Sequence, residues 1–212
     1  MASSATLDRL LSPKQCSVLT FELQRGVVGD LSTLPDFSAS VAKSGILEST
    51  AALLAAARRH QVTVVHCRAA FRSDRAGSFR NVPMVNRLLE NPDHVRLGSA
   101  AAELVPLLGP EESDLDSVRL HGMSPFTGTS LDPMLRSSGA STVIATGSSL
   151  NIGVLGLVIE ALNRGFDVVV PTDCVAGHPL EFGEQILKNS LKPISTLVTS
   201  SEIVEHWESL SR

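Results

Sequence analysis

Glu22, at the end of the first predicted strand, is a candidate for acid–base chemistry. It directly follows the apolar run 17–21, so it would stand at the carboxyl end of a buried strand. A carboxyl group held there is partly removed from water, which would raise its pKa and let it act as a general acid or base. The structural alternative is a glutamate that only caps the loop after the strand.

A second group of polar residues lies in the stretch 119–129. A strand over 117–121 would place Arg119 and His121 on one face and Leu120 on the other, because side chains alternate along a strand. Histidine is the usual carrier of protons near neutral pH. A lone histidine at a strand end can equally be a hydrogen-bonded structural group.

The stretch 146–154 runs from an apolar strand through a polar turn into a helix. The backbone N–H groups from Ser149 to Gly153 would then point at the sheet edge, where they could hold an anion or an oxyanion. The spacing matches neither of the two glycine-rich phosphate-loop patterns. The structural alternative is an ordinary strand-to-helix turn with Asn151 near the N-cap.

Short apolar runs alternate with longer helical stretches, and this alternation predicts a parallel sheet with helices on both faces. The predicted strands are 17–22, 62–67, 117–121, 142–147, 167–171 and 195–199, and the predicted helices are 39–60, 98–108, 130–138, 152–164 and 180–192. Parallel strands bring their carboxyl ends, and with them the three polar groups, to one edge. The irregular stretch 70–97 should cross the surface near that edge. We expect a tail over 1–14 and one domain over 15–212.

The composition is that of a globular protein and excludes several classes of function. The chain has 212 residues, of which 43% are hydrophobic and 19% charged, and its net charge is −4. Without a block of Lys and Arg, nucleic acid is not an expected partner. Because no apolar run reaches about 18 residues and the first residues lack a signal-like apolar core, we expect no membrane span and a cytoplasmic location. Three scattered cysteines predict neither a disulfide framework nor a zinc cluster.

Four segments, in matching order and spacing, resemble the isochorismatase-like (cysteine hydrolase) family. They are Glu22-Leu23-Gln24 after the first strand, Phe126-Thr127-Gly128-Thr129-Ser130-Leu131, Gly147 through Val154, and the stretch from Gly165 to Ala176. The likeness covers roughly residues 15–200, which suits one domain of this size. It implies a three-layer α/β/α architecture with a six-stranded parallel sheet, the Rossmann-like fold of these hydrolases.

The catalytic residues of that family are altered in this chain. Gly153 stands where the family has its nucleophilic cysteine, and Glu22 stands where it has an aspartate. The family lysine falls on Leu120, and a shift of one residue would offer His121 or Arg119 instead. We favour His121, because the glycine turn after it could absorb a deletion. The resemblance also offers a precedent, since true isochorismatases carry glycine at the cysteine position and protonate a vinyl ether from the carboxylic acid.

The resemblance therefore implies a hydrolase without a cysteine nucleophile, in which Glu22 is the general acid or base on a small polar or anionic vinyl ether, ester or amide. The expected catalytic residues are Glu22, His121 and Gly153, and the expected substrate-binding residues are Gln24, His66, Arg72, Arg119, Phe126, Ser148, Ser149, Leu150 and Asn151. The Ser148–Ser149 peptide is expected to be cis, as in relatives. Asp74 has no histidine partners nearby, so we expect neither a metal nor a cofactor.

Two other functions fit the same residues. The chain could be a catalytically inactive member of the fold with a binding or assembly role, because fold alone does not establish activity. It could also be an amidase that uses Cys67 or Cys174, although free cysteine is more often a small buried hydrophobe. Whichever of these functions applies, a homodimer or homotetramer is expected, with the apolar segment 152–164 as a candidate contact surface. The same segment could instead be the innermost helix of the monomer.

Overall fold

The central strand β1, Cys16–Phe21, is buried along its whole length and organises the sheet. In the computed structural model, which describes residues 3–210, β1 pairs in parallel with a strand on each side. Phe21 lies beside Cys67 of one neighbour and beside Gly147 of the other. The chain therefore leaves these strands at one edge of the sheet, as the alternation of strands and helices predicts.

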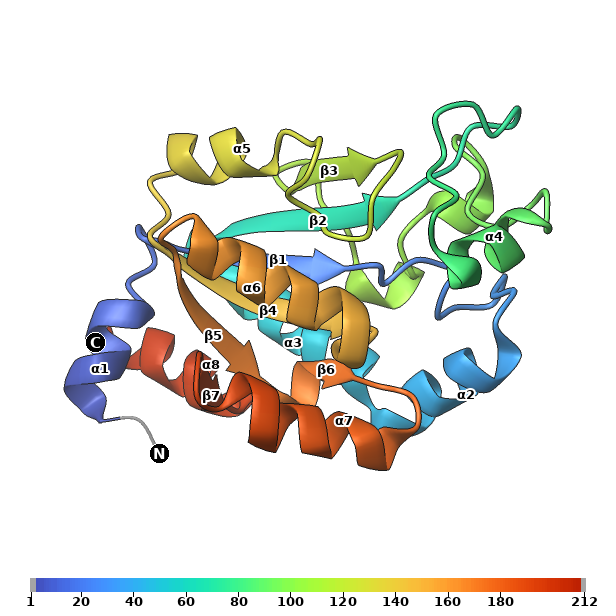
Figure 1. The fold of residues 1–212 in the computed structure, drawn as a ribbon. Coiled ribbons are helices and arrows are strands. Elements are labelled where there is room, and N and C mark those ends of the chain that lie inside the picture. The colour runs from blue at the N-terminus through green and yellow to red at the C-terminus, as the bar shows by residue number, and fades with distance from the viewer. Residues whose placement is uncertain (1–2, 211–212) are drawn as a thin grey trace.

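Within the described residues the sheet has seven strands, in the order β3-β2-β1-β4-β5-β7, with β6 paired beside the end of β4 (Figure 1). The other strands are β2 (Thr63–Ala69), β3 (Leu115–Arg119), β4 (Thr142–Ser148), β5 (Asp167–Pro171), β6 (Val175–Ala176) and β7 (Thr196–Val198). Every pairing between these strands is parallel. The predicted three-layer architecture is confirmed, with one strand more than the six expected. With two residues, β6 is too short for an apolar pattern to show.

Helices cover both faces of the sheet, and each face has its own apolar core (Figure 1). On one face α1, α3 and α8 pack around residues such as Leu53 and Trp207, which are fully buried. On the other face α5 and α6 pack around residues such as Leu135 and Leu157. Because successive side chains of a strand enter opposite cores, the strands are almost continuously apolar.

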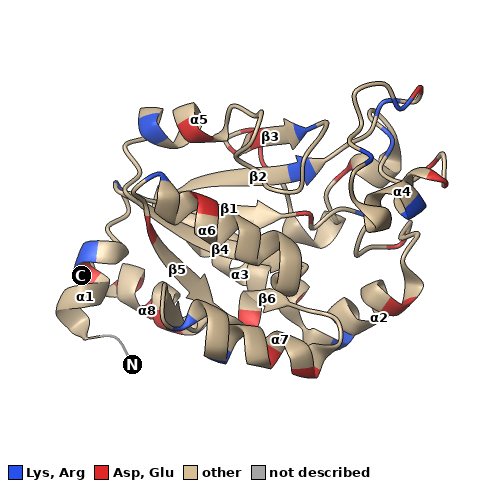
Figure 2. Ribbon diagram, viewed as in Figure 1, with Lys and Arg blue, Asp and Glu red and all other residues tan. Residues whose placement is uncertain are grey.

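The helical elements lie before the first strand, between the strands and after the last one. They are α1 (Ser4–Leu10), α2 (Pro35–Ser44), α3 (Ile46–Arg59), α4 (Pro83–Leu89), η1 (Ala100–Ala102), η2 (Pro106–Leu108), α5 (Leu131–Ser137), η3 (Leu150–Val154), α6 (Leu155–Asn163), η4 (Thr172–Cys174), α7 (Leu180–Ile186), η5 (Leu187–Leu191) and α8 (Ser200–Ser209). Among the helices of residues 3–210, none has the length and apolar character needed to cross a bilayer. Figure 2 shows basic and acidic residues interspersed along the outer helices and loops.

The predicted helix 39–60 is two helices, α2 and α3, separated at Gly45. Gly45 has a φ of 73°, a left-handed conformation that glycine adopts without steric cost. The first helix begins earlier than predicted, at Pro35, because a proline loses no hydrogen bond in the first helical turn. The break directs α2 beyond the carboxyl ends of the strands (Figure 1).

The prediction of a helix over 98–108 is wrong, since the structure has only the two short turns η1 and η2 there. The residues between the turns run beside the chain that leaves β1. The N–H of Arg25 donates to the carbonyl of Glu103 at 2.9 Å, and the N–H of Val105 donates to the carbonyl of Leu23 at 3.0 Å. These tertiary hydrogen bonds override the helical tendency of the alanines and leucines.

The stretch expected to be an N-terminal tail carries α1 and reaches the core. Leu10 and Leu11 are buried, and the indole N–H of Trp207 donates to the carbonyl of Leu11 at 2.8 Å. The segment from α1 to Leu11 is therefore packed, through its leucines, against the same face of the sheet as α8. The structure does not describe residues 1 and 2.

Gln24 joins the segments that meet at the carboxyl edge of the sheet. Its side-chain oxygen accepts from the N–H of Ala69 at 2.8 Å. Its side-chain nitrogen donates to the carbonyl of Ala69 at 2.8 Å and to the carbonyl of Ala102 at 2.9 Å. Gln24 is fully buried, so its expected role in substrate binding is replaced by a structural one: it ties the exit of β1 to the end of β2 and to η1.

Replacing Gln24 by leucine should destabilise the fold. The substitution leaves two backbone groups of Ala69 buried without these partners, and we expect the free energy of unfolding to fall by about 3 kcal/mol. Urea unfolding followed by circular dichroism measures it. The matched control is Gln185→Leu at an exposed glutamine, which should change the free energy by less than about 0.5 kcal/mol. Equal effects of the two substitutions would contradict the role given to Gln24.

Candidate active site

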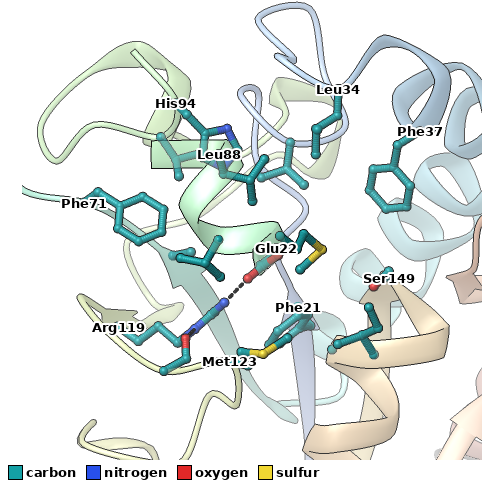
Figure 3. Close-up of a pocket in the computed structure, with 18 of the residues that line it drawn as sticks. Phe21, Glu22, Leu34, Phe37, Phe71, Leu88, His94, Arg119, Met123 and Ser149 are labelled. Atoms are coloured by element: carbon teal, nitrogen blue, oxygen red, sulfur yellow. Dashed lines mark hydrogen bonds and ion pairs between the residues drawn. The ribbon is translucent and has the colours of Figure 1, made fainter. Parts of the chain in front are cut away.

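A cavity of about 290 Å3 lies at the carboxyl ends of the central strands. Phe21 and Glu22 reach it from the end of β1, and Arg119 reaches it from the end of β3. Gly153 of η3 lines it as well, and most of the remaining wall comes from the stretches 27–37 and 71–95, with residues 121–123 and His178 also contributing. Figure 3 shows the Glu22–Arg119 pair in the middle of the residues that line the cavity. The site is thus at the edge that the parallel topology predicts.

The backbone turns at Glu22, the residue that follows β1. Its φ is 51°, which is uncommon for a residue with a Cβ. Its N–H still donates to the carbonyl of Cys67 at 3.0 Å, so the residue stays anchored to β2. The side chain is mostly buried and forms an ion pair with the guanidinium of Arg119. A carboxylate in this place can exchange a proton with a molecule in the cavity.

Arg119 is held by three groups and keeps one donor unused. Its guanidinium pairs with Glu22 and lies 5.1 Å from the centre of the Phe21 ring, and its Nε donates to the carbonyl of Gly122 at 2.9 Å. The side chain is only 9% exposed, and Nη1 has no hydrogen-bond partner within residues 3–210. A buried N–H group without an acceptor costs free energy. A ligand atom that accepts a hydrogen bond from Nη1 would remove this cost.

His121 lies at the cavity but is not the cation beside the carboxylate. The strand β3 ends at Arg119, two residues before the predicted end, so the expected shared face of Arg119 and His121 is wrong. The chain turns back there because Arg119 holds the carbonyl of Gly122. His121 is exposed in the following loop, where its ring lies against Gly128. Between the two candidates for the family lysine, the structure places Arg119 on Glu22.

The ring of Phe21 occupies the space that a side chain at position 153 would need. A Cβ added to Gly153 would overlap Cε1 of the Phe21 ring. The guanidinium of Arg119 lies over the same ring. The Phe21 ring can occupy its place only because residue 153 has no side chain. With the ring there, a cysteine side chain has no room at position 153.

The start of η3 supplies backbone donors to the cavity. Ser149, Asn151 and Gly153 line it, and η3 continues directly into α6. The N–H groups of a first helical turn have no acceptor inside the helix, so they can stabilise negative charge on a ligand. The Ser148–Ser149 peptide is cis, as the resemblance implies.

Six of the residues expected to bind substrate do not line this cavity, and each has a structural environment. Gln24 makes the hydrogen bonds described above. His66 is buried between Thr20, at 2.8 Å, and Asp114, at 3.1 Å. Burial lowers its pKa, so it is neutral at neutral pH.

The other four of these residues are exposed or buried away from the cavity. Arg72 is exposed and pairs with Asp74 at 2.7 Å. Phe126 is buried against Phe166, with 6.2 Å between the ring centres, and Leu150 is buried in the core beneath α6. Ser148, the last residue of β4, is fully buried and does not line the cavity either.

Sequence reasoning missed most of the residues that form the walls. Six of the apolar ones form what we call the apolar chamber: Leu34, Phe37, Phe71, Phe79, Leu88 and Val95. They come from the segment before and within α2 and from the stretch 71–95, which lacks a regular apolar period (Figure 3). The only available signal was the position of that irregular stretch after β2, which placed it correctly near the site.

His94 is the one buried imidazole in the cavity wall among the described residues. Its Nδ1 lies 2.6 Å from the hydroxyl of Thr33, and its ring lies 6.0 Å from that of Phe71. Burial lowers the pKa of His94 to about 4, and the positive charge of Arg75 adds to this effect. The ring is therefore neutral near pH 7 and behaves as a polar but uncharged part of the wall.

No cysteine is among the described residues that line the cavity. Cys16, Cys67 and Cys174 are all buried, and burial raises the pKa of each thiol to about 12. Such thiols are protonated at neutral pH and are poor nucleophiles. Within residues 3–210, no three His, Cys, Asp or Glu side chains come together as possible metal ligands.

Comparison with known proteins assigns the chain to a known protein family. Residues 18–203 match the family model of the Isochorismatase domain. The chain is 32% identical over 104 residues to the uncharacterized isochorismatase family protein YwoC of Bacillus subtilis, an alignment that covers 49% of this chain and 54% of that protein. It is 26% identical over 169 residues to the maleamate amidohydrolase of Pseudomonas putida, with 78% of this chain and 76% of that protein covered.

A solved structure supports the same fold. The crystal structure of a cysteine hydrolase from Pseudomonas syringae pv. phaseolicola superposes with a TM-score of 0.78 and covers 93% of this chain and 94% of that chain. The sequence identity is 21%, so this likeness concerns the architecture alone.

Adding a methyl group at position 153 should destabilise the protein. We expect Gly153→Ala to lower the free energy of unfolding by about 2 kcal/mol, because its Cβ overlaps the Phe21 ring. Gly156→Ala is the matched control in the same helical region: its Cβ meets open space, so the substitution should raise stability by roughly 0.5–1 kcal/mol. Urea unfolding of both variants measures the difference, and two stabilising substitutions would disprove the dependence on Phe21.

His94 should make the stability of the protein depend on pH. The pKa of His94 is about 4 in the fold and near 6.5 in the unfolded chain, so the unfolded state binds more protons between these values. Stability from the neutral ring is full above pH 6.5 and declines as the pH falls toward 4. Between pH 7.5 and pH 5 we expect a loss of about 2 kcal/mol from this group. In His94→Phe the pH dependence of unfolding should be weaker by that amount; an unchanged dependence would contradict the assignment.

Proposed function

Because the chain belongs to the isochorismatase family, we propose that it is a hydrolase that acts without a cysteine nucleophile. Glu22 is its general acid or base, and the bond cleaved is that of an amide, an ester or a vinyl ether. The maleamate amidohydrolase among its relatives supports hydrolysis of this kind. A homodimeric or homotetrameric assembly and a cytoplasmic location stay predictions.

The observation that carries the proposal is the pairing of Glu22 with Arg119 beside a glycine. In the ion pair Glu22 is the carboxylate, the form that accepts a proton. Phe21 fills the place of a nucleophile at Gly153, so water is the group that must attack. Arg119 takes the place beside the carboxylate that the family's lysine would have.

With an amide or ester, Glu22 acts first as a base. It takes a proton from a water molecule, whose oxygen bonds to the carbonyl carbon while the carbonyl electron pair moves to oxygen. The resulting oxyanion is stabilised by N–H groups at the start of η3 and by Nη1 of Arg119. The bond to the leaving group then breaks, and Glu22 returns the proton to the departing nitrogen or oxygen.

With a vinyl ether, Glu22 acts first as an acid, which requires that its carboxylate take up a proton from solvent before the reaction begins. The protonated carboxyl group donates its proton to the terminal vinyl carbon, which leaves an oxocarbenium ion next to the carboxylate. Water adds to this cation and gives up a proton to Glu22, and the hemiketal formed then breaks down to a carbonyl compound and an alcohol. Both sequences use the same residue and regenerate its starting protonation state.

A non-catalytic binding role is the second candidate, and the packing of Phe21 on Gly153 favours it. That packing removes the family's nucleophile position and leaves an intact cavity. A fold that keeps its cavity after losing a catalytic group can still bind the ligand. The two candidates differ in whether Glu22 is needed for turnover or only for binding.

Substitution of Glu22 tests the proposal directly. On a panel of amides, esters and vinyl ethers, Glu22→Gln should lower kcat/KM for the active compound by at least about 100-fold, because proton transfer by a positioned group contributes that much. Glu112→Gln, at an exposed glutamate outside the cavity, is the matched control and should retain full activity. Pretreatment with iodoacetamide should leave the activity intact, since all three thiols are buried.

The outcomes separate the candidate functions. Loss of activity on alkylation would point to Cys67 or Cys174 and overturn the proposed mechanism. Full activity of Glu22→Gln would do the same. If no compound of the panel is turned over, the non-catalytic binding role replaces the hydrolase.

A further inference from the structure

The apolar chamber makes up the part of the cavity that lies away from the Glu22–Arg119 pair. Figure 3 shows Phe71, Leu88, Leu34 and Phe37 spread around the opposite side from Phe21 and Met123. The cavity volume of about 290 Å3 is roughly twenty times the volume that one water molecule requires. A ligand that only bridged Glu22 and Arg119 would leave these apolar walls facing water, which is unfavourable.

The charges in the cavity argue against a strongly anionic ligand. Among the described residues that line it, Glu22 and Arg119 are the only carboxylate and the only guanidinium, and no lysine lines it. These two charges already neutralise each other in an ion pair. His94 is buried and uncharged near neutral pH. An additional negative charge would therefore lose its hydration without gaining a free cation.

The polar group that fits beside the ion pair is a hydrogen-bond acceptor. Nη1 of Arg119 is buried and without a partner within the described residues, and Arg119 lines the cavity. A carbonyl oxygen can accept from it without bringing a net charge. The neighbouring N–H groups of the first turn of η3 favour the same kind of atom.

We propose that the cavity binds a neutral carbonyl compound whose aryl or bulky alkyl body occupies the apolar chamber and whose carbonyl oxygen faces Arg119. The inference rests on the proposed function in placing the reacting group at Glu22. It replaces the expected small polar or anionic substrate by one with an apolar body. Each methylene group moved from water into the chamber should tighten binding about fourfold.

Three ketones test the inference, because they offer a carbonyl group but no bond to hydrolyse. They are 4-phenylbutan-2-one, butan-2-one and the anionic 4-oxopentanoate. Dissociation constants come from NMR titrations of the isotope-labelled protein. We expect 4-phenylbutan-2-one to bind at least about thirtyfold more tightly than either small ketone, given the methylene increment. Equal affinities, or tighter binding of 4-oxopentanoate, would overturn the inference.

A single substitution connects the affinity to the chamber. Leu34 is the N-cap residue of α2 and has no side-chain capping bond, so Leu34→Asn introduces a favoured cap while making the chamber wall polar. The fold should therefore be retained, and the affinity for 4-phenylbutan-2-one should fall roughly tenfold. Leu107→Asn, at an exposed leucine outside the cavity, is the matched control and should bind like the unmodified protein.

The binding readout is independent of catalysis. An unchanged affinity in Leu34→Asn would overturn the placement of the apolar body in the chamber. Tight binding of 4-phenylbutan-2-one by a protein that turns over no amide, ester or vinyl ether would uphold the chamber and reject the hydrolase. Turnover of small anionic compounds together with weak binding of the phenyl ketone would reject the chamber and uphold the hydrolase.

Discussion

The arrangement at the sheet edge depends on the buried carboxamide of Gln24. Three loops meet there, and loops in water would separate readily because few apolar contacts join them. By bonding to both backbone groups of Ala69 and to the carbonyl of Ala102, Gln24 makes the exits of β1 and β2 parts of one rigid unit. Glu22 lies two residues before it, so the position of the carboxylate follows from this anchor.

The site combines rigid and irregular parts of the chain. The strands and η3 supply the groups that need accurate placement: the carboxylate of Glu22, the guanidinium of Arg119 and the backbone donors near Gly153. The segments between elements supply the apolar chamber, whose role needs shape and apolarity more than exact direction. Accurate positioning of a few polar groups by a scaffold, with loops forming the surrounding walls, is a common division in α/β proteins.

The sequence was sufficient for six of the seven strands and for the location of Glu22, because strands buried on both faces are almost continuously apolar. It was insufficient where tertiary contacts decide the secondary structure. Residues 98–108 were predicted to be a helix, but Glu103 lies in an extended segment that is hydrogen-bonded to Arg25. That Arg119 and not His121 pairs with Glu22 follows from where β3 ends, and strand boundaries are poorly encoded in local pattern. One missed element had a local signal: Thr199 and Glu202 form the capping box that begins α8.

The contact between Phe21 and Gly153 constrains the evolutionary routes that lead to and from this chain. A cysteine at 153 introduced into the present background would meet the aromatic ring before it could meet a substrate. The reverse order, in which position 21 first becomes smaller, opens a gap and removes the ring beneath the Arg119 guanidinium. Each single change thus creates a packing defect, either a clash or a gap, that the present pair of residues lacks.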